Sequence, residues 1–184
     1  HQLYGLRRVY KSGAQDTTVM HRKTLLYSSH KIKQVQLSLD HRESYEVSRM
    51  GRVYDVEIKD DFVLITFKQT DGNDGVEYEH YLGIRGVQNV KINNKWIEKE
   101  YSYDKKRKAA STYWVYDALT FTPNNKVVFS VGKTKSECRT LCDITYHHFD
   151  DIITNVHLQA KENMPAYHKV TDSKQHVAVS MAAW

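Results

Sequence analysis

The sequence predicts an all-β protein, an antiparallel β-sandwich or jelly roll with at most one or two short helices. Many short stretches alternate apolar and polar residues, which is the side-chain period of a strand with one buried face. Turn-forming residues separate these stretches at intervals of roughly 8 to 12 residues, as in sandwiches and barrels. Only one stretch carries the signals of a helix, so alternating strand–helix units are not expected.

The clearest element is a β-hairpin over residues 53–68 with a two-residue turn at Asp60-Asp61. The opposing pairs are then Ile58 with Val63, Val56 with Ile65, and Tyr54 with Phe67. All six apolar side chains share one face, and a shift of one residue would set the apolar side chains of one arm against the polar side chains of the other. The pattern therefore predicts the register as well as the hairpin.

Further strands follow from the same alternation and from the turn signals between them. Strands are expected at residues 9–11, 25–27, 32–39 and 76–84, the last after the turn-rich segment 70–75. Two more hairpins are predicted, one around Asn93-Asn94 and one over residues 119–131 with a loop at Asn124-Asn125-Lys126. Residues 152–158 and 177–181 are expected to be the closing strands.

The one predicted helix begins at a capping box. Thr134 and Glu137 have the spacing in which a threonine side chain caps the first turn of a helix. Cys138 and Cys142, the only cysteines, would lie on one turn of this helix. They could form a disulfide, a metal-binding pair, or two free thiols packed under a sheet; helical Cβ directions fit a disulfide badly.

The bulk composition limits the classes of protein. The chain has 184 residues, is 40% hydrophobic and 27% charged, and is expected to form one β-rich domain over residues 1–184. This composition argues against a disordered or fibrous chain, and no apolar run is long enough for a membrane span. A chain that starts at His1 rather than Met is expected of a processed, tagged or excised product. The compartment stays open, with an extracellular or surface location favoured.

A basic and aromatic segment is the candidate ligand site. Aromatic rings stack on sugars or bases, and Lys and Arg bind phosphate or sulfate groups. The net charge of +5 permits such partners without requiring them. The ordinary explanation of a four-residue basic run is a solvated loop. The candidate residues are Tyr101, Tyr103, Lys105, Lys106, Arg107, Tyr113 and Trp114.

The candidate metal ligands are His147, His148 and Asp150. Imidazole and carboxylate groups suit zinc or a similar ion. Adjacent histidines on a strand point to opposite faces, so a polar loop is the competing interpretation. No cofactor is predicted. An acidic loop at residues 71–75 fits calcium poorly, because Leu82 stands where an EF-hand loop needs a carboxylate.

No glycine-rich phosphate loop, nucleophile elbow or zinc-protease motif is present in the sequence, which favours a non-catalytic protein. The first hypothesis is a recognition module of a surface or secreted protein that binds a glycan or a protein partner. It rests on analogy at the level of the fold. One alternative is a self-assembling structural subunit, such as a viral coat or surface protein, whose basic segments face nucleic acid or neighbouring copies. The other is a metal-dependent enzyme that uses residues 147–151.

Overall fold

The all-β class is confirmed by the structure, a computed structural model that describes residues 5–41, 49–70, 77–109 and 112–162. Strands make up 60% of the described residues and helices 21%. The described strands form one antiparallel sheet in the order β1-β2-β3-β8-β7-β6-β5, and β4 pairs with β8 beyond β3. A single bent sheet thus stands in place of the two sheets of a sandwich. The strands are β1 (Gly5–Val9), β2 (Gln15–His21), β3 (Thr24–His30), β4 (Val35–Leu39), β5 (Arg52–Lys59), β6 (Phe62–Gln69), β7 (Tyr78–Glu100) and β8 (Thr112–Gly132).

The predicted central hairpin is confirmed as β5 and β6, with the predicted register. Ile58 lies opposite Val63, Val56 opposite Ile65, and Tyr54 opposite Phe67. The burial of the other face of β6 was not predicted: Phe62 and Leu64 on that face are also buried. They pack under a helix, so β6 is covered on both sides.

Two predicted hairpins are wrong, because β7 and β8 each continue through the expected turns. Asn94 does adopt a left-handed conformation, with φ of 46°, but it lies beside a register shift inside β7. Asparagine tolerates this conformation in a β-bulge as well as in a turn. Residues 124–126 have no positive φ, and Lys126 pairs with Ser28 of β3.

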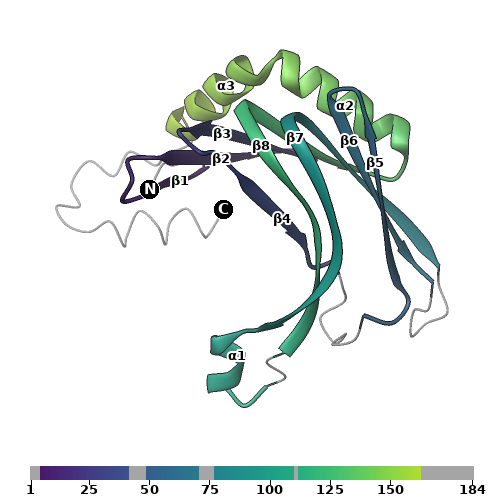
Figure 1. Ribbon diagram of the computed structural model, residues 1–184. Helices are drawn as coiled ribbons and strands as arrows, with labels where there is room; N and C mark the ends of the chain where they lie inside the picture. Colours follow the sequence, from purple (N-terminus) through teal and green to yellow (C-terminus); the bar gives the residue numbers. More distant parts are fainter. Residues whose placement is uncertain (1–4, 42–48, 71–76, 110–111, 163–184) are drawn as a thin grey trace.

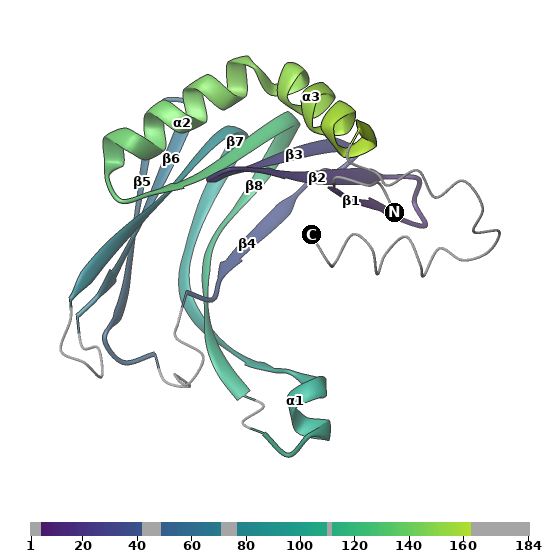
Figure 2. The same cartoon turned by 180° about the vertical axis from the view of Figure 1, so that it is seen from behind.

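Bulges bend the long β7–β8 ribbon. Gly86, Asn89 and Asn94 have positive φ, and the pairing with β8 shifts near each of them. At Gly86 a Cβ atom would lie 2.1 Å from the carbonyl oxygen of Lys126, so the close approach of the two strands requires glycine. The ribbon curves away from the helices towards the short helix α1 (Ser102–Lys106) at its tip (Figures 1 and 2).

The helices α2 (Lys135–His147) and α3 (Phe149–Glu162) cover the convex face of the sheet (Figure 1). The predicted cap is confirmed, since the Thr134 hydroxyl accepts a hydrogen bond of 3.1 Å from the Glu137 N–H. The strand predicted at residues 152–158 is wrong, because this segment belongs to α3. The apolar residues Phe149, Ile152, Ile153 and Val156 have helical spacing and pack against the sheet. The strand predicted at residues 177–181 lies outside the described residues.

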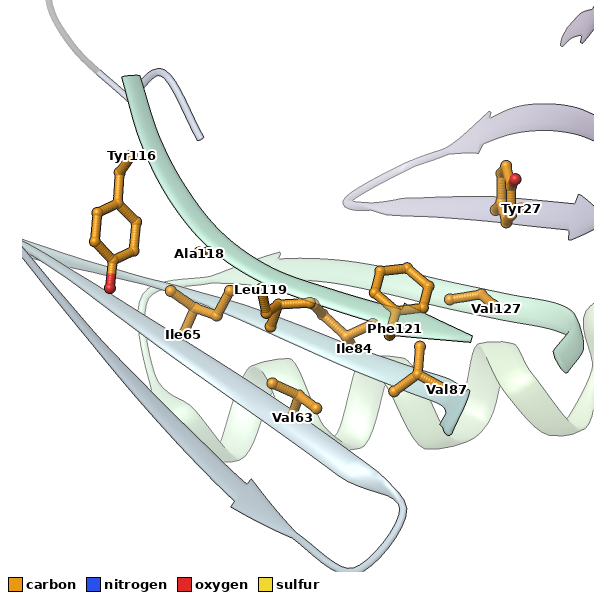
Figure 3. Close-up of a cluster of buried hydrophobic side chains, with 10 residues drawn as sticks. All are labelled: Tyr27, Val63, Ile65, Ile84, Val87, Tyr116, Ala118, Leu119, Phe121 and Val127. Atoms are coloured by element: carbon orange, nitrogen blue, oxygen red, sulfur yellow. The ribbon is translucent and has the colours of Figure 1, made fainter. Parts of the chain in front are cut away.

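Two apolar clusters lie on opposite faces of the sheet. The convex cluster joins the sheet to the helices and contains Cys138 and Cys142 as buried free thiols. Burial raises the pKa of the Cys142 thiol to about 12. The concave cluster gathers side chains from β3, β6, β7 and β8 (Figure 3). Its ten buried members are Tyr27, Val63, Ile65, Ile84, Val87, Tyr116, Ala118, Leu119, Phe121 and Val127.

A buried carboxylate stands at the β1–β2 end of the concave face. The Asp16 side chain is 1% exposed and accepts two hydrogen bonds of 2.8 Å from Arg8. The hydroxyls of Tyr10 and Tyr27 donate to the same carboxylate at 3.0 and 3.2 Å. Burial alone would raise the pKa of Asp16, but the hydrogen bonds from Arg8, Tyr10 and Tyr27 bring it below its ordinary value.

Candidate ligand pocket

A pocket of about 560 Å³ opens on the concave face, beside the buried cluster. Its floor consists of two rows of side chains that run across neighbouring strands. One row is Ile65, Leu82 and Val131, and the other is Tyr54, Phe67 and His80. Leu39, Asp40 and His41, where β4 ends, line the same pocket. The pocket therefore lies between the hairpin face that the sequence predicts and the end of β4.

Two histidines meet at this pocket. Nε2 of His41 lies 3.0 Å from Nδ1 of His80, so one ring donates a hydrogen bond and the other accepts it. The His41 ring centroid is also 4.1 Å from that of Phe67, which links the end of β4 to the floor. The alternation of residues 76–84 places His80 on the same strand face as Leu82, so this strand pattern and the predicted hairpin face are the sequence signals for the site. The partner His41 carried no such signal.

A buried arginine supports one wall of the pocket. The Arg52 side chain is 0% exposed, and its guanidinium lies 4.9 Å from the ring centroid of Trp96. It donates a hydrogen bond of 3.0 Å to the Trp114 carbonyl and lies 3.9 Å from the Asp40 carboxylate. These contacts tie the start of β5 to the bent part of the β7–β8 ribbon. No local sequence pattern predicts a role for Arg52, because its partners are distant along the chain.

Tyr54 continues this wall. Its ring stacks on Tyr116 with centroids 4.3 Å apart and planes 5° apart, and Trp96 meets it edge-on at 5.6 Å. Burial raises the pKa of Tyr54 to about 12. Rings packed in this way lose little conformational freedom when a ligand binds beside them.

Two lysines stand at the pocket. The Lys23 ammonium lies 2.5 Å from Oε1 of Glu137, and the Lys133 backbone N–H donates to Oε2 of the same carboxylate at 2.9 Å. These hydrogen bonds lower the pKa of Glu137. In the described part of the chain, the Lys133 ammonium itself has no ion-pair partner. Among the described residues, the pocket thus combines apolar walls with a lysine that forms no ion pair.

The predicted ligand residues come together elsewhere, at the tip of the β7–β8 ribbon. The Tyr101 and Tyr113 rings are 5.3 Å apart, although Tyr113 is buried. Tyr103 is 69% exposed, and the Arg107 guanidinium lies 4.7 Å from its ring centroid. The remaining predicted residues also lie at this end: Lys105 pairs with Glu100, Lys106 is exposed, and Trp114 lies under the Arg49 guanidinium. None of these residues lines the pocket, although the Tyr101 hydroxyl donates a hydrogen bond of 3.2 Å to Asp40 of the pocket lining; their role in binding stays a prediction.

The predicted metal ligands lie at the junction of α2 and α3. His147 ends α2, His148 follows it, and Asp150 is in the first turn of α3. The Asp150 carboxylate pairs with Lys126, and His148 lies 3.6 Å from Asp151. Across the described ranges, no three His, Cys, Asp or Glu side chains converge as ligands of one ion. The metal site stays a prediction. The acidic loop at residues 71–75 lies outside the described residues.

Comparison with known proteins finds no matching family model, no similar curated protein and no similar solved structure. Among the described helices, none has the length and apolar character needed to cross a membrane.

Proposed function

We propose that the chain is a non-catalytic recognition module whose pocket on the concave face takes an apolar or aromatic group of its ligand. The observation that carries this proposal is the pocket itself, with Ile65, Phe67, Leu82 and Val131 in its lining. Its volume of about 560 Å³ falls within the range of roughly 300 to 1,000 Å³ that is usual for small-molecule sites.

The lining favours an apolar ligand over a glycan. A sugar presents many hydroxyl groups, and each needs a hydrogen-bond partner when it leaves water. The floor side chains of β6 that line the pocket, Ile65 and Phe67, have no hydrogen-bonding atoms. Several polar groups nearby are already bonded to one another, as in the pair of His41 with His80 and that of Lys23 with Glu137. The glycan and nucleic-acid partners expected of the ribbon tip therefore stay separate predictions.

A pocket-filling variant tests the proposal. Val131 lines the pocket and is 51% exposed, so Val131→Trp adds an indole without overpacking a closed core. The probe is Nile red, a neutral dye that becomes fluorescent in apolar surroundings. We expect saturable dye binding by the unaltered chain and at least a roughly five-fold weaker affinity in Val131→Trp, because the indole takes the space of the ligand.

The matched control is Ile58→Trp. Ile58 is 45% exposed on β5 and does not line the pocket, so this variant adds the same side chain elsewhere. It should bind the dye as the unaltered chain does, and thermal unfolding should show that both variants fold. The proposal is wrong if the unaltered chain shows no saturable binding, or if both tryptophan variants bind equally well.

A further inference from the structure

We propose that the ligand of this pocket is an anionic amphiphile, a carboxylate carried on an apolar chain, with the carboxylate bound between Lys133 and His80. This inference rests on the proposed function, because it assigns the chemistry of the group that extends from the apolar part of the same pocket. Both residues line the pocket.

The two residues lie at one end of the β7–β8 pairing. Tyr81 of β7 pairs with Gly132 of β8 in antiparallel register. His80 precedes Tyr81 on β7, and Lys133 follows Gly132, the last residue of β8, so each residue is next to the final pair of this ladder and lines the pocket there. An anion placed there contacts one side chain of β7 and one of the segment that follows β8. The Leu82–Val131 pair, one step in the other direction, begins the apolar floor.

The Lys133 ammonium is available for an external anion. Glu137 is the nearby carboxylate, but its two oxygens accept hydrogen bonds from the Lys23 ammonium and from the Lys133 backbone N–H. Asp40, the acidic residue in the pocket lining, lies 3.9 Å from Arg52 and accepts a hydrogen bond of 3.2 Å from the Tyr101 hydroxyl. The acidic groups around the pocket therefore have other partners. In the described part of the chain, no carboxylate forms an ion pair with the Lys133 ammonium, although the charge of Glu137 acts on it at longer range.

His80 supplies the complementary hydrogen bond. Its Nδ1 faces His41 Nε2, and for its Nε2 the described part of the chain offers no hydrogen-bond partner. When His41 donates to Nδ1, the neutral His80 ring carries its proton on Nε2. A carboxylate accepts hydrogen bonds only, so it matches an ammonium and an imidazole N–H together. A neutral alcohol gains much less from the ammonium, and a cationic amphiphile is repelled by it.

The apolar part of the pocket fits the rest of such a molecule. From Leu82 and Val131 the floor continues to Ile65 and Phe67, which leads away from Lys133 across three strands. An acyl chain along this floor removes methylene groups from water, at about 0.8 kcal/mol for each one fully buried. The acyl chain of the ligand would thus supply most of the affinity, and the carboxylate would fix the orientation of the ligand in the pocket.

Displacement of Nile red by three twelve-carbon compounds tests the inference. These are dodecanoate, dodecan-1-ol and dodecylammonium, each used below the concentration at which it forms micelles. With the unaltered chain, we expect dodecanoate to displace the dye at roughly ten-fold lower concentration than dodecan-1-ol, and dodecylammonium to be the weakest. In Lys133→Met, dodecanoate should bind roughly five-fold more weakly and dodecan-1-ol almost unchanged, because the lost contact is ionic.

Lys59→Met is the control for charge. Lys59 is exposed next to the β5–β6 turn, at the opposite end of β5 from Tyr54, and does not line the pocket. It should leave both affinities unchanged. If dodecanoate and dodecan-1-ol displace the dye equally well, or if Lys133→Met weakens both to the same extent, the anionic ligand is wrong and the apolar pocket stands. If none of the three compounds displaces the dye and the dye itself does not saturate, the proposed function fails as well.

Discussion

The two faces of the bent sheet bury their apolar side chains in different ways. On the convex face, α2 and α3 bury an apolar cluster whose members include Leu26, Phe62 and Phe149. On the concave face, no helix of the described chain packs on the sheet, and β4, the ribbon and β5 enclose the side chains between them. The concave face also holds buried polar groups, Asp16 and Arg52, each bonded to partners from other strands.

This difference separates stability from recognition. A helix laid on a sheet fills the interface with side chains at close packing and leaves little space. A sheet that bends over itself packs against its own distant strands through a smaller interface. Here a pocket remains between the sheet and the end of β4. The convex face should therefore dominate the free energy of unfolding, and the concave face should dominate binding.

The largest expected effect is on the free energy of unfolding, in a comparison of two buried phenylalanines. Phe149→Ala in the convex cluster should lower the free energy of unfolding by about 3 to 5 kcal/mol, because a closed core cannot collapse onto the cavity. Phe67→Ala should cost about 1 to 2 kcal/mol less, because Phe67 already borders open space. Urea unfolding measures both, and Nile red binding should be lost only in Phe67→Ala. Equal costs, or loss of binding in Phe149→Ala under conditions where it is folded, would remove the distinction between the faces.

A smaller effect is expected from the buried carboxylate of the concave face. Asp16→Asn should destabilise the chain by roughly 2 kcal/mol at pH 7, because the hydrogen bonds to Arg8 lose their ionic character. The pKa of Asp16 is below its ordinary value in the folded chain, so the contribution of its charge is present above about pH 4 and lost as the pH falls further. Urea unfolding from pH 7 to pH 2.5 should show the two proteins converging in stability. A constant difference over this range would exclude an ionised Asp16 as the cause.

The smallest effect at neutral pH is expected at Tyr54. Tyr54→Phe should change the free energy of unfolding by less than about 1 kcal/mol at pH 7, because the stacked ring remains. The folded chain has the pKa of Tyr54 raised to about 12, whereas a tyrosine of the unfolded chain ionises near about pH 10. The unaltered chain should thus lose stability as the pH rises from 10 to 12, and the variant should lose less. Identical alkaline profiles would place the Tyr54 hydroxyl in contact with water.

Local patterns were enough to predict the class of fold, the central hairpin and the helix cap. In each case the deciding residues lie within one turn or one pair of strands, as in Ile58 opposite Val63 and Thr134 with Glu137. The predictions were wrong where a residue type or a short apolar run is compatible with two kinds of local structure. Asn94 has the left-handed conformation expected of a turn but uses it for a bulge, and Ile152 and Ile153 were assigned to strand although their spacing with Phe149 is helical.

The pocket could not be predicted from the sequence, because its residues come together only in the tertiary fold. The hairpin face was predicted, but a row such as Tyr54, Phe67 and His80 reads equally well as ordinary core. The features that distinguish it are the end of β4 at His41 and the lysine after β8, which lie far apart in the chain. The ribbon tip, by contrast, was predicted as a cluster because its residues are contiguous.

The state of the two cysteines has a practical consequence for spectroscopy. They are the only thiols of the chain, both are buried, and burial raises the pKa of each, so little of the reactive thiolate exists at neutral pH. A maleimide or nitroxide reagent should therefore ignore the native thiols and attach to a single cysteine introduced at exposed Lys106 in α1. A probe there would report the position of the ribbon tip directly, and the two native cysteines of the core would not have to be replaced first.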